Sequence, residues 1–249
     1  MNKRPPVAEK LLWDSKFFGF PMARINPAIL TPGQMKSALE FCLKNRIRCL
    51  FWRASSNDAL SVELAEEHGF HLANFRMTYE FDFDLGHVFP QVREHEFKFR
   101  QARKSDLSEL MAISKNLYLD SRYYYDRTFS RVACDRFYGE WIKKLVNSQK
   151  TGQQVYVLDH GKKIAAYIGY EVSDGTVRLV LVGVSHSYQG RGVGKILLGL
   201  FLKQMFKEGF TKFEVVTQGR NIASQRLYQS CGFKIAASHI DYHRWFEHI

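Results

Sequence analysis

The amino-acid sequence predicts an α/β protein with a mixed β-sheet, and two observations lead to this prediction. Segments with the alternating pattern of strands take turns with segments of helical periodicity along the chain. A buried apolar run at 177–184 also leads through a glycine-rich turn into an apolar helix.

The chain has 249 residues, enough for one large domain or two small ones. Because residues 85–95 lack periodicity and contain Gly and Pro, we expect a boundary there, with domains 1–88 and 89–249.

The first half should hold two helices among three strands. Pro32 favours the start of a helix that runs to about Lys44. Ser56 or Asn57 is expected to cap a second helix, which should stop at Gly69. The expected strands, from their apolar runs or their alternation, are 22–25, 49–52 and 75–83.

The second half should continue the alternation with longer elements. Ser105 and Asp106 are expected to cap a helix that ends near Tyr118. The other helices expected from apolar periodicity are 129–146, 192–207 and 221–230. The expected strands are 96–101, 154–158, 163–171, 177–184 and 212–217, followed by two terminal strands.

The two halves echo each other weakly. When Gly69 is aligned with Gly232, Ser61 falls on Ser224 and a strand of the first half falls on a strand of the second. A partial repeat and a chance similarity are both compatible with this match. Since the first half has no glycine-rich loop, we expect the chemistry in the second half.

Positive charge dominates the composition, with a formal net charge of +11. Such a surplus favours anionic partners. A nucleic acid, a phosphate-rich small molecule and a merely solvated basic surface are all compatible with it. Because the basic residues are dispersed, with no arginine-rich tail and no nucleic-acid motif, no nucleic-acid partner is expected.

The sequence carries no targeting or metal-binding pattern. No apolar run approaches the roughly 20 residues that span a bilayer, and no apolar stretch follows the basic N-terminus as it would in a signal peptide. The four cysteines form no CxxC pair. We therefore expect a cytoplasmic protein with reduced, mostly buried thiols, no membrane span and no metal site.

A glycine-rich segment lies between the strand at 177–184 and an apolar helix. It reads Gln189-Gly190-Arg191-Gly192-Val193-Gly194. Glycines let the backbone approach a ligand because no Cβ intervenes. Free N–H groups and the dipole at a helix N-terminus attract an anion by roughly 0.3–1 kcal/mol, and Arg191 and Lys195 add positive charge. The segment predicts a seat for a diphosphate; a turn selected only for tight packing is the alternative.

A polar stripe marks the helix expected at 221–230. Asn221, Ser224 and Tyr228 are three and then four residues apart, so a helix presents them on one face. A ligand-facing tyrosine and a core aromatic are the two interpretations of Tyr228. The neighbouring Leu227 fits the core position better, which favours the first.

The glycine-rich segment resembles the Q/R-x-x-G-x-G/A signature of GNAT N-acetyltransferases, and the stripe resembles the Asn- and Tyr-bearing helix of that family. The resemblance covers the chain from about residue 96 to the end. It implies a GNAT fold there, with a smaller, partial GNAT-like domain before it. It also implies direct attack of an amine on acetyl-CoA, with Tyr228 as the general acid. A phenol with a pKa of about 10 can protonate a leaving thiolate.

The resemblance further implies where acetyl-CoA binds. The implied residues are Val182, Gly183, Val184, Gln189, Gly190, Arg191, Gly192, Val193, Gly194, Lys195, Asn221 and Ser224. Members of the family often carry a carboxylate base near the strand before the loop, but residues 178–184 contain none. Glu171, Glu214 and His186 are open candidates for the base, and none is preferred.

An aromatic and arginine-rich stretch offers an acceptor site. Tyr and Trp interleaved with Arg can stack on a base or sugar and neutralise phosphate, and a packed helix pair is an equal alternative. The candidate substrate-binding residues are Arg122, Tyr124, Tyr125 and Tyr138. Together with residues 11–20, this stretch resembles the dTDP-fucosamine acetyltransferase type, which acetylates the amine of a nucleotide-linked amino sugar.

The acceptor therefore has one leading candidate and several alternatives. The leading candidate is the primary amine of a nucleotide-linked amino-deoxy sugar, and the charge of +11 suits two diphosphate ligands in one cleft. A protein or peptide amine, another small amine, and a non-catalytic acyl-CoA-binding module are the alternatives. A homodimer is left open.

Overall fold

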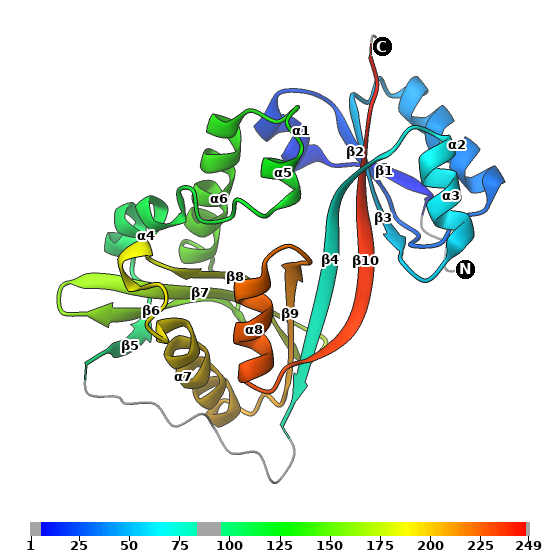
Figure 1. Ribbon diagram of the computed structural model, residues 1–249. Coiled ribbons are helices and arrows are strands. Elements are labelled where there is room, and N and C mark those ends of the chain that lie inside the picture. The colour runs from blue at the N-terminus through cyan, green and yellow to red at the C-terminus, as the bar shows by residue number, and fades with distance from the viewer. Residues whose placement is uncertain (1–5, 84–95, 248–249) are drawn as a thin grey trace.

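The computed structural model describes residues 6–83 and 96–247, which form one mixed ten-stranded sheet (Figure 1). In order across the sheet, the strands are β1 (Ala8–Lys10), β2 (Met22–Ile25), β3 (Cys49–Ser55), β10 (Lys234–Trp245), β4 (His71–Asp82), β9 (Lys212–Gln218), β8 (Thr176–Val184), β7 (Lys163–Ser173), β6 (Gln153–His160) and β5 (Lys98–Gln101). β2 pairs with β3 in parallel, as β8 does with β9, and the other neighbours are antiparallel. The expected α/β architecture with a mixed sheet is confirmed.

Helices cover both faces of the sheet. They are α1 (Leu12–Phe18), α2 (Pro32–Lys44), α3 (Ala59–Glu67), α4 (Leu107–Ser114), α5 (Arg122–Tyr125), α6 (Arg131–Val146), α7 (Val193–Lys207) and α8 (Ile222–Ser230), with 3-10 turns at Lys104–Asp106 and His186–Tyr188. The alternation of β3 shows how the layers arise. Leu50 and Trp52 pack with α2 and α3, whereas Phe51 packs with α5 and α6 on the other face.

The two helices predicted in the first half begin close to where they are expected, but the residue that caps α3 differs from the expected one. α2 begins at Pro32 and ends at Lys44, as expected. α3 is capped by Asp58, not by Ser56 or Asn57. The Oδ2 atom of Asp58 accepts from the amide of Ser61 at 2.9 Å, because a carboxylate three residues before that amide reaches it directly.

Two expected boundaries differ from the structure. α4 ends at Ser114, before Tyr118, because Lys115 is extended and Asn116 has a φ of 59°. The two expected terminal strands are one strand, β10, with irregular register near Ile235 and Asp241. α1, β1 and α5 are short, and no periodicity in the sequence indicated them.

The last strand joins the two halves of the chain. β10 lies between β3 and β4 and pairs with both. Figure 1 shows β10 running beside β4 through the middle of the molecule. The first half thus shares its sheet with the C-terminal strand. The expected division between residues 88 and 89 lies outside the described residues, so it stays a prediction.

β8 and β9 separate before either strand ends. Their parallel ladder stops at the pair Leu179 and Val215, although β8 continues to Val184 and β9 to Gln218. β8 remains paired with β7 as far as Val184. The gap therefore opens toward the carboxyl ends of two parallel strands, where α/β proteins commonly bind ligands.

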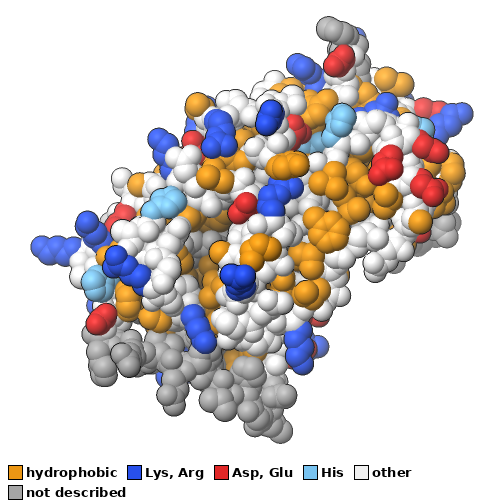
Figure 2. Space-filling view, viewed as in Figure 1, with side chains coloured by type: hydrophobic (Ala, Val, Ile, Leu, Met, Phe, Trp, Pro, Cys, Tyr) orange, Lys and Arg blue, Asp and Glu red, His pale blue; other side chains and the backbone are white. Residues whose placement is uncertain are grey.

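The surface carries its basic charge in a dispersed form. On the face in Figure 2, Lys and Arg side chains are spread out with hydrophobic side chains between them.

All four cysteines are buried and none is in a disulfide. Among residues 6–83 and 96–247, no helix combines the length and the apolarity that crossing a bilayer requires.

Candidate functional site

A cavity of about 1320 Å³ lies at the gap between β8 and β9. Trp13, Arg53 and Arg76 line it from the first half of the chain, and Val182 and Tyr228 line it from the second. Pockets for one small molecule commonly measure about 300–1,000 Å³. This cavity therefore has room for two ligands side by side.

The glycine-rich loop borders the cavity with free amides. Gly190 and Gly192 have φ values of 74° and 75°, and a Cβ built on either would meet no atom within 4 Å. The N–H groups of residues 190–194 have no hydrogen-bond acceptor among the described residues. Because α7 begins at Val193, its positive end adds to these donors. The loop can hold an anion without rearranging.

Two other glycines of the predicted site have packing roles. A Cβ on Gly194 would lie 3.1 Å from Cδ2 of Leu227, so glycine lets α7 approach α8, although Gly194 also lines the cavity. A Cβ on Gly183 would lie 2.6 Å from the ring of Tyr167. Gly183 and Arg191 are not among the described residues that line the cavity.

β8 presents Val182 and Val184 to the cavity. β9 does not pair with this part of β8, so the main-chain edge of β8 faces the gap. The Nε2 atom of Gln189 donates to the carbonyl oxygen of Val184 at 3.0 Å. Gln189 thereby ties the start of the loop to the end of the strand.

The predicted stripe on α8 faces the same cavity. Asn221, Ser224 and Tyr228 all line it. Asn221 is also the N-cap of α8, since its Oδ1 atom accepts from the amide of Ser224 at 3.0 Å. Its Nδ2 group has no acceptor among the described residues and can donate to a ligand. The cap fixes the direction in which the stripe points.

Tyr228 is both a core aromatic and a cavity residue. Only 4% of it is exposed, and its ring centroid lies 5.9 Å from those of Tyr79 and Phe233. Burial raises the pKa of Tyr228 above its usual value, while the Ser224 hydroxyl acts in the opposite direction. The phenol therefore holds its proton at neutral pH.

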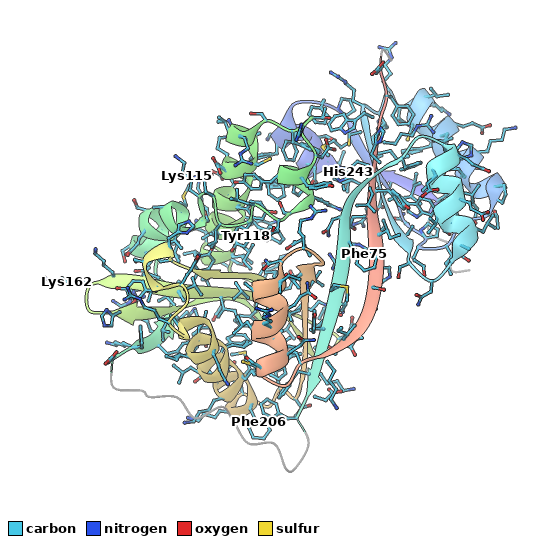
Figure 3. All side chains as sticks on the ribbon, viewed as in Figure 1. Phe75, Lys115, Tyr118, Lys162, Phe206 and His243 are labelled. Atoms are coloured by element: carbon cyan, nitrogen blue, oxygen red, sulfur yellow. The ribbon has the colours of Figure 1, made fainter. Side chains whose placement is uncertain are left out.

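A second phenol at the cavity, Tyr118, was not identified from the sequence. Its hydroxyl lies 2.6 Å from that of Tyr167, and its ring stacks on Tyr138 with centroids 4.4 Å apart. Figure 3 shows Tyr118 between the helices α4–α6 and α8. It follows α4 in a turn, where no periodic pattern marks a functional side chain.

The three candidate bases differ in position. Glu171 and Glu214 line the cavity, and His186 is not among its described lining residues. Glu214 forms an ion pair with Arg178 at 3.3 Å. Glu171 accepts from Nε2 of Gln153 at 3.5 Å. Because both carboxylates interact with neighbours, the geometry assigns the base to neither.

The candidate acceptor residues divide into two groups. Arg122 and Tyr138 line the cavity, but Tyr124 and Tyr125 do not. The Tyr124 hydroxyl donates to a carboxylate of α6, and Tyr125 stacks with the guanidinium of Arg220, 3.6 Å from its ring centroid. Since α5 is a single turn, consecutive side chains point to different sides.

A buried carboxylate at the cavity, Asp241, also went unnoticed in the sequence. Its oxygens lie 3.0 Å from Nε of Arg53 and 3.0 Å from Nδ2 of Asn74. Burial alone would raise the pKa of Asp241, but Arg122 and Arg53 bring it down to about 2. These groups meet only because β10 lies between β3 and β4, a pairing that no local pattern reveals.

Comparison with known proteins connects this site to a family. Residues 115–233 match the acetyltransferase (GNAT) family. The spore coat polysaccharide biosynthesis protein SpsD of Bacillus subtilis (strain 168) is 24% identical over 149 residues, which are 60% of this chain and 51% of the relative. The chain thus spans about half the length of that curated relative.

Solved structures share the fold over most of the chain. A GCN5-related N-acetyltransferase from Sphaerobacter thermophilus matches with a TM-score of 0.66 at 13% identity, over 96% of this chain and 76% of the other. A tandem GNAT protein from the clavulanic acid biosynthesis pathway matches with a TM-score of 0.60 at 14% identity, over 90% of this chain and 75% of the other. The expected GNAT fold is confirmed.

Proposed function

Residues 115–233 belong to the acetyltransferase (GNAT) family, and we propose that this protein moves an acetyl group from acetyl-CoA to the primary amine of a nucleotide-linked amino-deoxy sugar. One observation carries the proposal. A single cavity is lined by the glycine-rich loop, by Tyr228 and by guanidinium groups of the first half of the chain. Acetyl-CoA and the amine can therefore be bound in this cavity at the same time, as a direct transfer requires.

The loop is the proposed seat of the diphosphate of acetyl-CoA. The free amides of residues 190–194 supply hydrogen-bond donors, and the N-terminus of α7 supplies the positive end of a helix dipole. Lys195 lines the cavity from the first turn of the helix and adds a full positive charge. Asn221 can donate its Nδ2 group to the amide-rich arm of the coenzyme.

β8 is the proposed support of the thioester. Its edge at Val182 and Val184 is not paired with β9. An N–H group of Val182 that donates to the thioester oxygen would stabilise the negative charge that develops there. The strand is held by β7 on its other side, so the donor is preorganised.

The transfer itself uses Tyr228 as a general acid. The amine nitrogen attacks the thioester carbon and forms a tetrahedral oxyanion. When this intermediate collapses, the C–S bond breaks and the thiolate takes the proton of the Tyr228 hydroxyl. The nitrogen loses its extra proton to water, and Tyr228 regains a proton from solvent. A phenol is protonated at neutral pH, and burial raises the pKa of Tyr228 further, so the proton is present when the thiolate leaves.

The acceptor end of the cavity supports a nucleotide sugar. Trp13 and Trp141 offer aromatic faces for a base or sugar ring, Tyr138 lines the cavity with its ring stacked on Tyr118, and Arg122 offers charge for phosphate. The relative SpsD bears the name of a spore coat polysaccharide biosynthesis protein, which also favours a sugar. We assign this acceptor end to the proposed N-terminal domain, residues 1–88, together with α5 and α6.

A thiol-release assay tests the proposal. Acetyl-CoA is offered with a dTDP-linked 4-amino sugar, with the free amino sugar, and with a peptide that carries a free N-terminal amine. Turnover should be fastest with the nucleotide sugar. Faster turnover of the peptide would favour protein acetylation, and acetyl-CoA binding without turnover of any amine would favour a non-catalytic module. Either result would overturn the proposed acceptor.

A further inference from the structure

We propose that Arg76, together with Arg53, forms a phosphate subsite for the acceptor, separate from the glycine-rich loop. The assignment to the acceptor rests on the proposed function, whereas the phosphate subsite itself rests on geometry. Arg53 and Arg76 come from β3 and β4, in the first half of the chain, and both line the cavity.

Three neighbouring strands build the floor of this subsite. Arg53, Asp241 and Asn74 are cross-strand partners on β3, β10 and β4, so their side chains share one face of the sheet. Asp241 accepts from Arg53 and from Asn74, each at 3.0 Å. Arg76 is two residues after Asn74 on β4 and therefore lies on the same face.

A third guanidinium approaches from the helix layer. Arg122 of α5 lies 3.9 Å from Oδ1 of Asp241 and covers the ring of Phe51, with 4.3 Å between guanidinium carbon and centroid. Its position is thus fixed by a cation–π contact and an ion pair. Arg53, Arg76 and Arg122 all act on Asp241, and Asp14 also acts on Arg122. Three guanidinium groups thus face two carboxylates, which leaves positive charge in excess.

Arg76 is the guanidinium of this group that makes no direct hydrogen bond or ion pair within residues 6–83 and 96–247. Burial lowers the pKa of Arg76 to about 10, and repulsion from Arg53 adds to this effect. The carboxylates of Asp241 and Glu214 act in the opposite direction, but each is already paired with another arginine, so Arg76 has no acceptor of its own. An anion in the cavity would supply both the counter-charge and the acceptors.

Phosphate fits this site better than a carboxylate does. Asp241 already fills the role of a single carboxylate between Arg53 and Arg122. The remaining positive charge matches a group with more negative charge and more acceptor oxygens, and guanidinium forks suit phosphate geometry. Two further carboxylates that line the cavity act on these guanidinium groups, and both have partners: Asp14 of α1 accepts from the Tyr123 hydroxyl at 3.3 Å, and Glu214 forms an ion pair with Arg178.

Titration of coenzyme-saturated protein tests the subsite. Coenzyme A is added first, so that the loop is occupied, and inorganic pyrophosphate or dTDP is then titrated by calorimetry. Wild type should bind both probes. Arg76→Gln should weaken both by roughly ten- to a hundredfold, the usual effect of losing a charged hydrogen bond. Arg127→Gln removes the same charge from an exposed residue outside the cavity and should bind as wild type does.

Several outcomes would overturn the inference. It fails if Arg76→Gln binds the probes as tightly as wild type does, or if coenzyme-saturated wild type binds neither probe. It also fails if succinate, a dicarboxylate used for comparison, binds more tightly than pyrophosphate. A melting temperature at or above that of wild type is expected for Arg76→Gln, because the variant removes an unpaired charge; a lower one would indicate a structural role. If the probes bind through Arg76 but no nucleotide amino sugar is acetylated, the subsite stands and the proposed function fails.

Discussion

Tyr228 joins a packed ring to a hydroxyl at the cavity, and substitution separates these two roles. Tyr228→Phe keeps the ring contacts with Tyr79 and Phe233 and removes only the proton donor. Turnover should fall by about 10²–10⁴-fold, the usual contribution of a positioned acid. The Kd of acetyl-CoA, measured by calorimetry, should stay within about twofold.

Two other tyrosines serve as controls for this variant. Tyr156→Phe removes a hydroxyl that contacts Glu208 outside the cavity and should leave turnover unchanged. Tyr118→Phe removes the other phenol that lines the cavity. If Tyr118→Phe abolished turnover and Tyr228→Phe did not, the acid would be Tyr118 and the assignment would be wrong.

Because of Asp241, the free energy of unfolding should depend on pH in the acid range. Its pKa of about 2 in the folded protein lies below the value of 3.8 expected without partners. Its ionised form therefore stabilises the fold above about pH 4, and this stability, on the order of 2 kcal/mol, is lost as the pH falls toward 2. Asp241→Asn should destabilise the protein by at least about 2 kcal/mol near neutral pH, since the side chains of Arg53 and Arg122, which are 43% and 23% exposed, lose their counter-charge.

Urea unfolding at several pH values measures this effect. The stability gap between wild type and Asp241→Asn should narrow as the pH falls from about 5 toward 2. Asp126, whose pKa is also lowered to about 2, is unchanged in both proteins and cancels in the comparison. A gap that stays constant over this range would mean that Asp241 does not stabilise the fold through its charge.

At the scale of elements, the loop before α7 can be tested without disturbing its backbone. Gly192 has a φ of 75°, so most side chains would strain it, but Asn tolerates this region. Gly192→Asn should place its side chain in the diphosphate seat and weaken acetyl-CoA binding by roughly tenfold or more. The Kd from calorimetry is the measurement.

Gly209→Asn is the matched control for the loop. Gly209 follows α7, has a φ of 91° and, like Gly192, leaves open space around an added Cβ. It does not line the cavity. Its Asn variant should bind acetyl-CoA as wild type does. Equal affinities in both variants would contradict the role of the loop.

Elements with local signals could be predicted from the sequence, and those defined by distant contacts could not. α2, α7 and α8 follow from Pro32, from the glycine-rich loop and from the stripe that starts at Asn221, because caps and periodicity are local. The two segments aligned in the weak echo both have the order strand, helix, strand, β3–α3–β4 and β9–α8–β10. The position of β10 between β3 and β4 had no local signal.

The same distinction applies to the candidate site. The loop and Tyr228 could be predicted because short motifs hold their residues together. Arg53, Arg76 and Asp241 lie on three different strands, so only the topology brings them into one cavity. Tyr124 and Tyr125 stand beside Arg122 in the sequence, but a single helical turn directs them away from it.

At the scale of the whole molecule, the cavity belongs to both halves of the chain. The second half supplies the loop, β8 and α8, and the first half supplies Trp13, Arg53 and Arg76. β10 links the two, since it pairs with β3 and β4 after the chain has completed α8. In the proposed arrangement, Lys195 faces the donor and Arg53 and Arg76 face the acceptor, which agrees with a cavity larger than one ligand needs.

Amide NMR of 15N-labelled protein tests most directly whether the loop amides bind the diphosphate of acetyl-CoA. Acetyl-CoA should shift the backbone N–H resonances of residues 190–194, whose donors are unpaired in the described structure. Acetyl-pantetheine, which lacks the diphosphate, should leave these resonances in place while it shifts those of Val182 and Val184. If acetyl-CoA bound and the loop resonances did not move, the coenzyme would lie elsewhere and the account would be wrong.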